Sequence, residues 1–243
     1  MTEPDGPRPV WLFLPGMMCD ERLFAAQIRY LGHAIDARVA RFDVGQSIDA
    51  FAEHALALVP ENRRVTLVGL SMGGIVAMAC LRIAPDRIAG LVLMDTNPLS
   101  EVADRRSLRG PQIERVLDGE LDAVLIEEMK PAYLAPGNAA DETLLELVLD
   151  MARSLGAEAF ARQSTALAAR PDYSSTLAAW RGPSLIVCGR HDALCPPARH
   201  ELMASLIEGA RLEIVEQAGH LVTLEAPAVV NGLLEGVLSA QRA

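Results

Sequence analysis

One short stretch constrains the fold of this chain more than any other: residues 69–74, with the sequence GLSMGG. A mainly apolar run at residues 64–70 leads directly into it, and a second apolar run at residues 75–83 continues from it. The first run has the length of a buried strand, and the second continues as a buried helix. Glycines at 69 and 73 allow strand and helix to pass so closely that a side chain would clash. The sequence therefore predicts a strand, a tight turn with Ser71 at its apex, and a helix.

Strand and helix patterns alternate along the rest of the chain, apart from its middle third. Asp20 and Ser47 each precede a helical pattern and have the side chains of N-caps. The predicted strands are residues 10–14, 36–44, 64–70, 88–94, 184–188 and 211–215, and the predicted helices are residues 20–31, 47–59, 75–83, 198–207 and the segment after Pro227. Such alternation predicts an α/β fold with a mostly parallel, doubly wound sheet.

From about residue 98 to residue 181 the pattern changes to amphipathic helical stretches with no strand pattern between them. Helix-breaking residues divide this segment at Gly110-Pro111, Lys130-Pro131, Pro136-Gly137 and Gly156. The resulting helical stretches are residues 112–117, 121–129, 143–155 and 158–168. We therefore expect an all-helical cap, or lid, at residues 98–181, inserted in a core made of residues 1–97 and 182–243.

Composition limits the partners of this protein. The net charge of −10 disfavours nucleic acid, because phosphate binding needs a basic face. No apolar run reaches the ~18 residues of a membrane span, so no membrane partner is expected. Residues 1–9 are acidic and proline-rich, without the basic and apolar regions of a signal peptide, which predicts a frayed tail and a cytoplasmic protein. The oligomeric state cannot be predicted from these features.

The cysteines do not have the spacing of a metal site. Cys19, Cys80, Cys188 and Cys195 occur in apolar surroundings with no C-x-x-C pair, which is typical of reduced thiols. No cluster of His, Cys, Asp and Glu with ligand spacing is visible. We therefore expect neither a metal nor a cofactor.

Chemically useful side chains follow several of the predicted strands. Ser71, Asp95, Asp192 and His220 each come at or just after a strand end. The carboxyl ends of parallel strands meet at one edge of a sheet, which is where α/β proteins place their sites. A serine hydroxyl needs a base to become a nucleophile, and an imidazole held by a carboxylate can act as that base. The order Ser, Asp, His therefore predicts a nucleophilic site.

Three blocks in this order resemble the α/β-hydrolase superfamily: GLSMGG, then GRHDALCPP at residues 189–197, then AGHLVTLEAPAVV at residues 218–230. The resemblance extends from about Val10 to the final helix and makes residues 69–73 a nucleophile elbow. It implies that Ser71 is the nucleophile, His220 the general base and Asp192 the acid that orients the imidazole. Some α/β-hydrolases have the acid one strand earlier, which leaves Asp95 as the alternative, although the block around Asp192 favours Asp192.

The resemblance also implies an oxyanion hole made of backbone N–H groups. By position these belong to Met72, directly after the nucleophile, and to Met17, in the loop after the first strand. A common His-Gly pair is replaced here by Pro15-Gly16, and Pro15 offers neither an N–H nor an imidazole. The assignment of Met17 therefore has less support than that of Met72.

The residues expected around the reaction centre are apolar. We expect Met18, Leu194, Leu221 and Val222 to contact the substrate, in a pocket that is mainly apolar and has no strong binding group for a charged substrate. Met129, Tyr133 and Met151 of the cap are further candidates, for which core packing is an equally good interpretation.

Departures from related enzymes narrow the chemistry. C–C bond hydrolases of the meta-cleavage type usually have a polar residue before the serine and a tryptophan after the histidine, where this chain has Leu70 and Leu221. Menaquinone-pathway relatives carry an arginine after the elbow glycines, where this chain has Ile75. We therefore expect a serine hydrolase acting on a small or medium, mainly apolar carboxylic ester or thioester. The alternatives are a C–C bond hydrolase, a lactonase, a cofactor-free haloperoxidase or perhydrolase, and a non-catalytic ligand-binding protein of the same fold.

Overall fold

The computed structural model of the chain describes residues 7–129 and 132–242. The beginning of the expected N-terminal tail, residues 1–6, and the expected helix break at Lys130-Pro131 lie outside the described residues. None of the described helices has the length and apolar character needed to cross a membrane.

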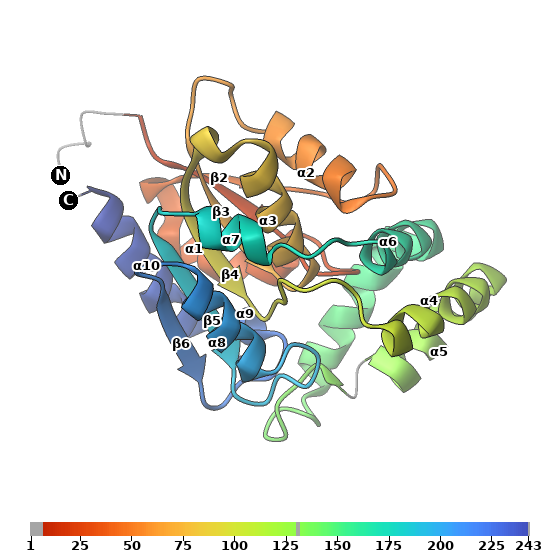
Figure 1. Cartoon of the computed structure of the whole chain (residues 1–243). Helices are drawn as coiled ribbons and strands as arrows, with labels where there is room; N and C mark the ends of the chain where they lie inside the picture. Colours follow the sequence, from red (N-terminus) through yellow and green to blue (C-terminus); the bar gives the residue numbers. More distant parts are fainter. Residues whose placement is uncertain (1–6, 130–131, 243) are drawn as a thin grey trace.

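A six-stranded sheet forms the centre of the molecule, with the order β2-β1-β3-β4-β5-β6 (Figure 1). All neighbouring strands pair in parallel, which confirms the predicted parallel sheet. The strands are β1 (Val10–Leu14), β2 (Asp36–Val39), β3 (Val65–Leu70), β4 (Ile88–Met94), β5 (Ser184–Gly189) and β6 (Arg211–Val215). The central strands β1 and β3 are buried along their whole length, which explains why their sequences are continuous apolar runs.

The predicted strand at residues 36–44 is wrong in length, since β2 ends at Val39. The strand lies at the edge of the sheet and pairs only with β1, and this pairing ends at Phe13 and Val39. Beyond it the chain turns away through Gly45, whose φ of +93° favours glycine.

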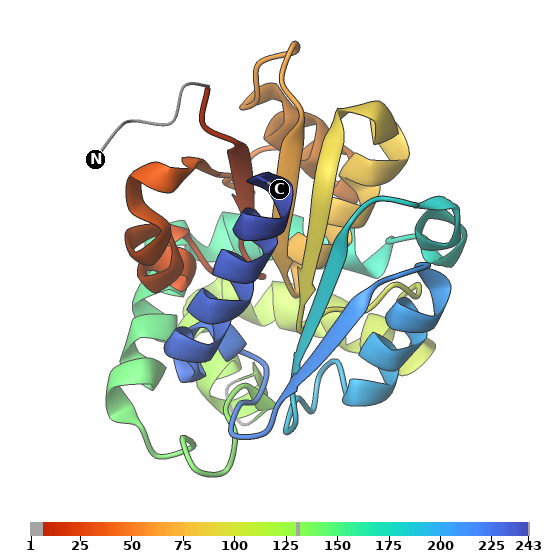
Figure 2. The same ribbon diagram turned by 90° about the vertical axis from the view of Figure 1, so that its left-hand side faces the viewer.

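Helices cover both faces of the sheet, as a doubly wound fold requires (Figure 2). One face contacts α2 (Ile48–Ala57), α3 (Met72–Ile83), α7 (Ser174–Ala179) and α8 (Pro197–Leu206), and the other contacts α1 (Ala25–Leu31) and α10 (Pro227–Arg242). The short α9 (Val222–Glu225) precedes α10. Phe51 and Met203 are fully buried on the first face, and Leu234 is fully buried on the second.

The predicted N-caps are present, but one helix differs from its prediction. The Ser47 hydroxyl accepts a hydrogen bond from the Ala50 N–H at 3.1 Å, at the start of α2. The Asp20 carboxylate accepts from the Arg22 N–H at 3.0 Å, and a 3₁₀ turn at Glu21–Phe24 follows before α1 begins. The single helix predicted for residues 20–31 is therefore two elements, because Asp20 caps the tighter turn first.

The segment between β4 and β5 is helical, and no described residue in it belongs to a strand. It contains α4 (Ala103–Arg115), α5 (Leu121–Val124) between two π-helical turns at Val116–Glu120 and Leu125–Met129, and α6 (Glu142–Ala168), followed by α7. In Figures 1 and 2 most of this segment gathers at one end of the sheet. It has a small core of its own, which includes Leu125 and Phe160.

Two predicted helix breaks in this segment have different outcomes. Pro111 lies inside α4, so the break expected at Gly110-Pro111 is wrong. No residue of α4 is buried, and water can therefore reach the carbonyl group that Pro111 leaves without its N–H partner. Gly156 has a φ of +80° within α6 and divides that helix at the expected place.

Candidate active site

Ser71 lies in a strained turn between β3 and α3, as the elbow motif predicts. Its φ of +55° is in the left-handed region, which costs a non-glycine residue about 1–3 kcal/mol. Close packing of the surrounding backbone holds this turn, because a Cβ at Gly69 would lie 2.4 Å from the Gly73 oxygen. A Cβ at Gly73 would lie 1.8 Å from the Leu14 oxygen of β1. Both glycines are therefore required by contact between the strands and the helix.

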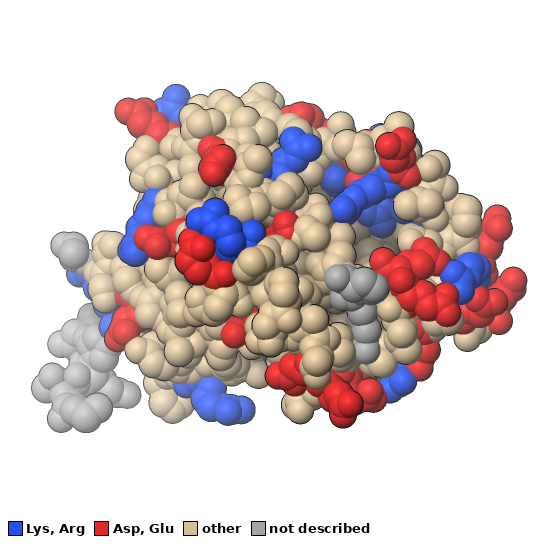
Figure 3. Space-filling view, turned by 90° about the horizontal axis from the view of Figure 1, so that it is seen from below, with Lys and Arg blue, Asp and Glu red and all other residues tan. Residues whose placement is uncertain are grey.

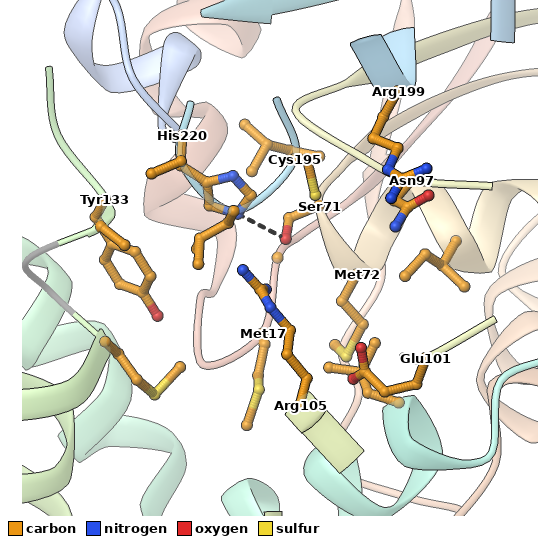
Figure 4. A pocket seen from close by; sticks show the side chains of 18 of the residues that line it. Met17, Ser71, Met72, Asn97, Glu101, Arg105, Tyr133, Cys195, Arg199 and His220 are labelled. Atoms are coloured by element: carbon orange, nitrogen blue, oxygen red, sulfur yellow. Dashed lines mark hydrogen bonds between the residues drawn. The ribbon is translucent and has the colours of Figure 1, made fainter. Parts of the chain in front are cut away.

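The fold brings three distant predicted residues into one hydrogen-bonded line, and Figure 4 shows the bond between the first two, Ser71 and His220. His220 Nε2 lies 2.9 Å from the Ser71 hydroxyl oxygen, and His220 Nδ1 lies 2.9 Å from Asp192 Oδ2. With Nδ1 protonated, the imidazole donates to Asp192 and accepts from Ser71. This arrangement allows the imidazole to remove the proton from the serine.

Asp192 is held as a carboxylate. Its Oδ1 accepts hydrogen bonds from the backbone N–H groups of Leu194 and Cys195, both at 2.8 Å. Burial raises the pKa of Asp192, but the attraction and hydrogen bond of His220 outweigh it and hold this pKa below its usual value. The carboxylate is therefore ionised at neutral pH and can accept the Nδ1–H of His220.

Asp95, the alternative acid, has hydrogen-bond partners other than His220. Its two oxygens accept from the backbone N–H groups of Gly189 at 2.9 Å and Val222 at 3.0 Å. Burial, and next the nearby charge of Asp192, raise the pKa of Asp95 well above its usual value. The structure thus places Asp192 against His220, whereas Asp95 ties the end of β4 to the end of β5 and the start of α9.

Contacts that the sequence did not predict hold the loop that carries His220. The His220 N–H donates to the Tyr133 carbonyl at 2.7 Å, and the two rings stack with centroids 6.0 Å apart. The Glu225 carboxylate accepts from the N–H groups of Gly219 at 2.8 Å and Ala135 at 2.7 Å. The position of Glu225 five residues after the histidine was visible in the third motif block, but its contact with the segment around Ala135 was not.

Two backbone N–H groups near Ser71 are available for a ligand. Neither the Met72 N–H nor the Met17 N–H has a hydrogen-bond partner among the described residues. Met72 is the first residue of α3, where helix N–H groups and the helix dipole favour negative charge. The side chains of both residues line the cavity beside Ser71.

A cavity of about 610 Å³ opens above Ser71, a size typical of small-molecule sites. Of the residues expected to contact a substrate, Leu194 and Leu221 line it, as do Met129 and Tyr133 of the helical insert.

The expectation that Met18 and Val222 contact the substrate is wrong, because both are buried and neither lines the cavity. The Met18 side chain packs in the small core of the insert, and its N–H donates to Gln163 Oε1 at 2.8 Å. Val222 begins α9 and packs against the sheet. Met151, a further candidate from the insert, is fully buried in the same core as Val222 and does not line the cavity either.

Apolar residues form the larger part of the cavity wall, but the wall also contains charged side chains that the sequence did not place there. Four arginines and two glutamates line it: Arg105, Arg109, Arg170, Arg199, Glu101 and Glu128. The signal for the first two was their spacing of four residues on a helix, which places them on one face of α4. Arg170 and Arg199 lie on other elements, and no local pattern connects them with Ser71.

Two groups of side chains within the described residues have the proximity of metal ligands: Asp95 with Cys188 and His200, and Asp192 with Cys195 and His220. Their donor atoms are already used, since His200 Nε2 accepts from the Thr96 N–H at 3.0 Å. Burial raises the pKa of both cysteines, which disfavours the thiolate that binds metals. The donor sets therefore do not favour a metal.

A strained serine at a strand-to-helix turn, hydrogen-bonded to a histidine and an aspartate beside a cavity, is the arrangement of an α/β-hydrolase. The model of the alpha/beta hydrolase family matches residues 11–233, and the chain belongs to this family.

Similar proteins carry several activities. A putative 2-succinyl-6-hydroxy-2,4-cyclohexadiene-1-carboxylate synthase of Bacillus subtilis is 28% identical over 97% of this chain and 87% of its own length. A pimeloyl-[acyl-carrier protein] methyl ester esterase of Aromatoleum aromaticum is 26% identical over 80% of this chain and 81% of its own. The structure of a thermophilic esterase from Thermogutta terrifontis is 28% identical, with a TM-score of 0.90 over 98% of this chain and 92% of that one.

Proposed function

We propose that this protein is a serine hydrolase that cleaves carboxylic esters or thioesters through an acyl-enzyme on Ser71. The observation that carries the proposal is the continuous hydrogen-bonded line from Ser71 through His220 to Asp192. The esterases among the similar proteins support the ester class, because two of them match most of this chain.

In the proposed first step, the Ser71 oxygen attacks the ester carbonyl carbon while His220 Nε2 takes the hydroxyl proton. The resulting oxyanion accepts hydrogen bonds from the Met17 and Met72 N–H groups. His220 then gives the proton to the leaving alcohol or thiol, and the acyl group remains on Ser71. A water molecule deprotonated by His220 then attacks the acyl carbon, the bond to the Ser71 oxygen breaks, and His220 returns the proton to Ser71 as the acid is released.

The helical segment at residues 98–181 has a role in this proposal as a cap over the core formed by the rest of the chain. The support for this role is that Tyr133, Met129 and the two arginines of α4 line the same cavity as Ser71. A cap of this kind excludes water and shapes the pocket for a small-molecule substrate.

A fluorophosphonate probe tests the proposal directly, because it labels a serine only where a base activates it. We expect stable labelling of the wild-type protein and none of a Ser71→Ala variant that keeps the wild-type circular dichroism spectrum. Absence of labelling in folded wild-type protein would overturn the proposal and favour a ligand-binding role for the fold.

A substrate panel then separates the hydrolytic alternatives. It contains esters and thioesters of graded acyl length, a lactone, a C–C hydrolysis substrate and a peroxide assay. We expect the largest kcat/KM for an ester or thioester. A larger value for the C–C substrate would move the protein to another branch of the family, in spite of Leu70 and Leu221.

A further inference from the structure

The cavity contains charged groups that the proposed hydrolysis does not use. The whole chain has a net charge of −10, yet arginines outnumber glutamates by four to two on the cavity wall. On the outer surface, Figure 3 shows acidic side chains gathered at its right-hand end, the side on which Figure 1 draws α4 and α5. Three acidic residues of the insert, Asp118, Glu120 and Glu127, are exposed. The cavity therefore differs in sign from the surface around it.

Both glutamates of the cavity wall pair with arginines. Glu101 is buried and pairs with Arg109, whose Nε lies 2.8 Å from Glu101 Oε2, and with Arg170 at 3.0 Å. Glu128 pairs with Arg115 and accepts a hydrogen bond from Gln112 at 2.7 Å. These groups satisfy one another and leave no carboxylate of the wall free to bind a further cation.

Arg105 and Arg199 differ from these paired arginines, because neither side chain has a hydrogen bond or ion pair with any described residue. Figure 4 shows Arg105 extending into the cavity from α4 of the insert and Arg199 extending into it from α8 of the core. Asn97 also lines the cavity, and its Oδ1 already accepts from the Leu99 N–H at 3.0 Å. The amide N–H groups of Asn97 are thus a third set of donors.

Two unpaired guanidinium groups beside a reactive serine define the chemistry of a ligand. A guanidinium is always charged and binds carboxylates and phosphates with paired N–H donors. At physiological salt the exposed acidic groups of the surface are screened beyond about 8 Å, so the local arginines determine the potential inside the cavity. An anion can therefore bind here despite the acidic surface.

We propose that the substrate carries, in addition to its ester, an oxyanionic group that binds to Arg105 and Arg199. This inference rests on the proposed esterase function and narrows its substrate class from mainly apolar esters to anionic ones. The group is a carboxylate or a phosphate, and both arginines are specificity-determining residues.

Matched chromogenic esters test the substrate class. The panel pairs p-nitrophenyl hemisuccinate and hemiglutarate with the neutral p-nitrophenyl butyrate and valerate, and adds a phosphonate-bearing ester of the same length. We expect kcat/KM for a charged ester to exceed that of its neutral partner by about tenfold or more, the effect of one charge-assisted hydrogen bond. Comparison of the carboxylate and phosphonate esters identifies which oxyanion is preferred.

Variants of Arg105 and Arg199 then test whether these side chains cause the preference for charged esters. Arg105→Gln and Arg199→Gln should each lower the ratio of charged to neutral kcat/KM by about tenfold. Arg29→Gln is the control, because Arg29 is an exposed arginine outside the cavity and its replacement changes the net charge equally. An unchanged ratio in both cavity variants, with neutral esters still hydrolysed, would overturn the inference and leave the esterase function in place.

A binding measurement without turnover distinguishes failure of the anion site from failure of the proposed esterase function. In a Ser71→Ala background, glutarate and 3-phosphonopropionate are titrated calorimetrically, and Arg105→Gln in the same background should weaken the binding of the better ligand about tenfold or more. Binding that depends on Arg105, together with no hydrolysis by wild-type protein, would support the anion site and overturn the esterase function. No detectable binding of either anion and no charge preference in hydrolysis would overturn the anion site.

Discussion

The two walls of the cavity are built in different ways. The core wall consists of strand ends and tight turns, where Ser71, Asp192 and His220 are fixed by backbone hydrogen bonds and by glycines in close contact. The wall formed by the insert includes the exposed helix α4, where Arg105 is exposed and unpaired, whereas Arg109 is half-buried and pairs with Glu101. The proposed reaction therefore depends on rigid local geometry, whereas the proposed selectivity depends on side chains that meet across the cavity.

The largest effect should come from the acid on the core wall. We expect Asp192→Asn to lower kcat about 10⁴-fold, because the amide favours the wrong imidazole tautomer. Asp95→Asn is the matched control and should keep kcat within about tenfold while it destabilises the protein by about 1–3 kcal/mol, since an amide NH₂ group would face a backbone N–H. Steady-state kinetics and urea unfolding measure both quantities, and the reverse pattern would move the role of the acid to Asp95.

The buried ion pairs test the other wall. Glu101→Gln should lower the free energy of unfolding by about 3–5 kcal/mol, because it leaves the guanidinium groups of Arg109 and Arg170 without their carboxylate. Glu128→Gln removes an outer carboxylate of the same wall and should have a much smaller effect. Equal effects of the two variants in urea unfolding would show that the burial of Glu101 is not what stabilises this wall.

The same carboxylate predicts a pH dependence of stability. Burial raises the pKa of Glu101, but Arg109 and Arg170 outweigh burial and hold this pKa below the usual value of 4.5. The unfolded chain therefore binds the proton first, so the contribution of Glu101 is present above about pH 4.5 and is lost as the pH falls through the lower folded pKa. Thermal unfolding of the wild-type and Glu101→Gln proteins from pH 7 to pH 3 should show their stabilities converging.

His200 gives a similar test on the core side. Burial lowers its pKa from 6.5 to about 4, and its Nε2 accepts from the Thr96 N–H in the neutral form. Between these values the unfolded chain binds the proton more readily, so stability should fall by up to about 3 kcal/mol as the pH decreases from 6.5 to 4. His200→Gln should lack this part of the pH dependence, and an unchanged slope in urea unfolding would contradict the assignment.

The smallest effect should come from Glu225, which joins the two walls. Glu225→Gln places an amide NH₂ group against backbone donors at Gly219 or Ala135, and we expect a loss of stability of about 1–2 kcal/mol with a fall in kcat of about tenfold. Asn138→Ala removes only one donor to the same carboxylate and should change both quantities less. A larger effect of Asn138→Ala would show that the position of His220 depends on the insert rather than on Glu225.

The amino-acid sequence by itself determined the α/β-hydrolase fold, the turn at Ser71 and the residues that meet there. These features depend on local rules: apolar runs of strand length, glycines at a close approach, and side chains that follow strand ends. The sequence did not predict that α4 continues through Pro111 or that β2 ends early. The first depends on the exposure of α4, and the second on where the pairing between β1 and β2 ends.

Only the tertiary structure decided how the cavity is lined. The sequence placed Met18 and Val222 near the reaction centre, yet the fold turns both side chains into hydrophobic cores. It also brings Arg105 and Arg199, almost a hundred residues apart, into one cavity and leaves them without a partner. No local pattern encodes such a meeting, because the contact depends on how the insert packs over the core.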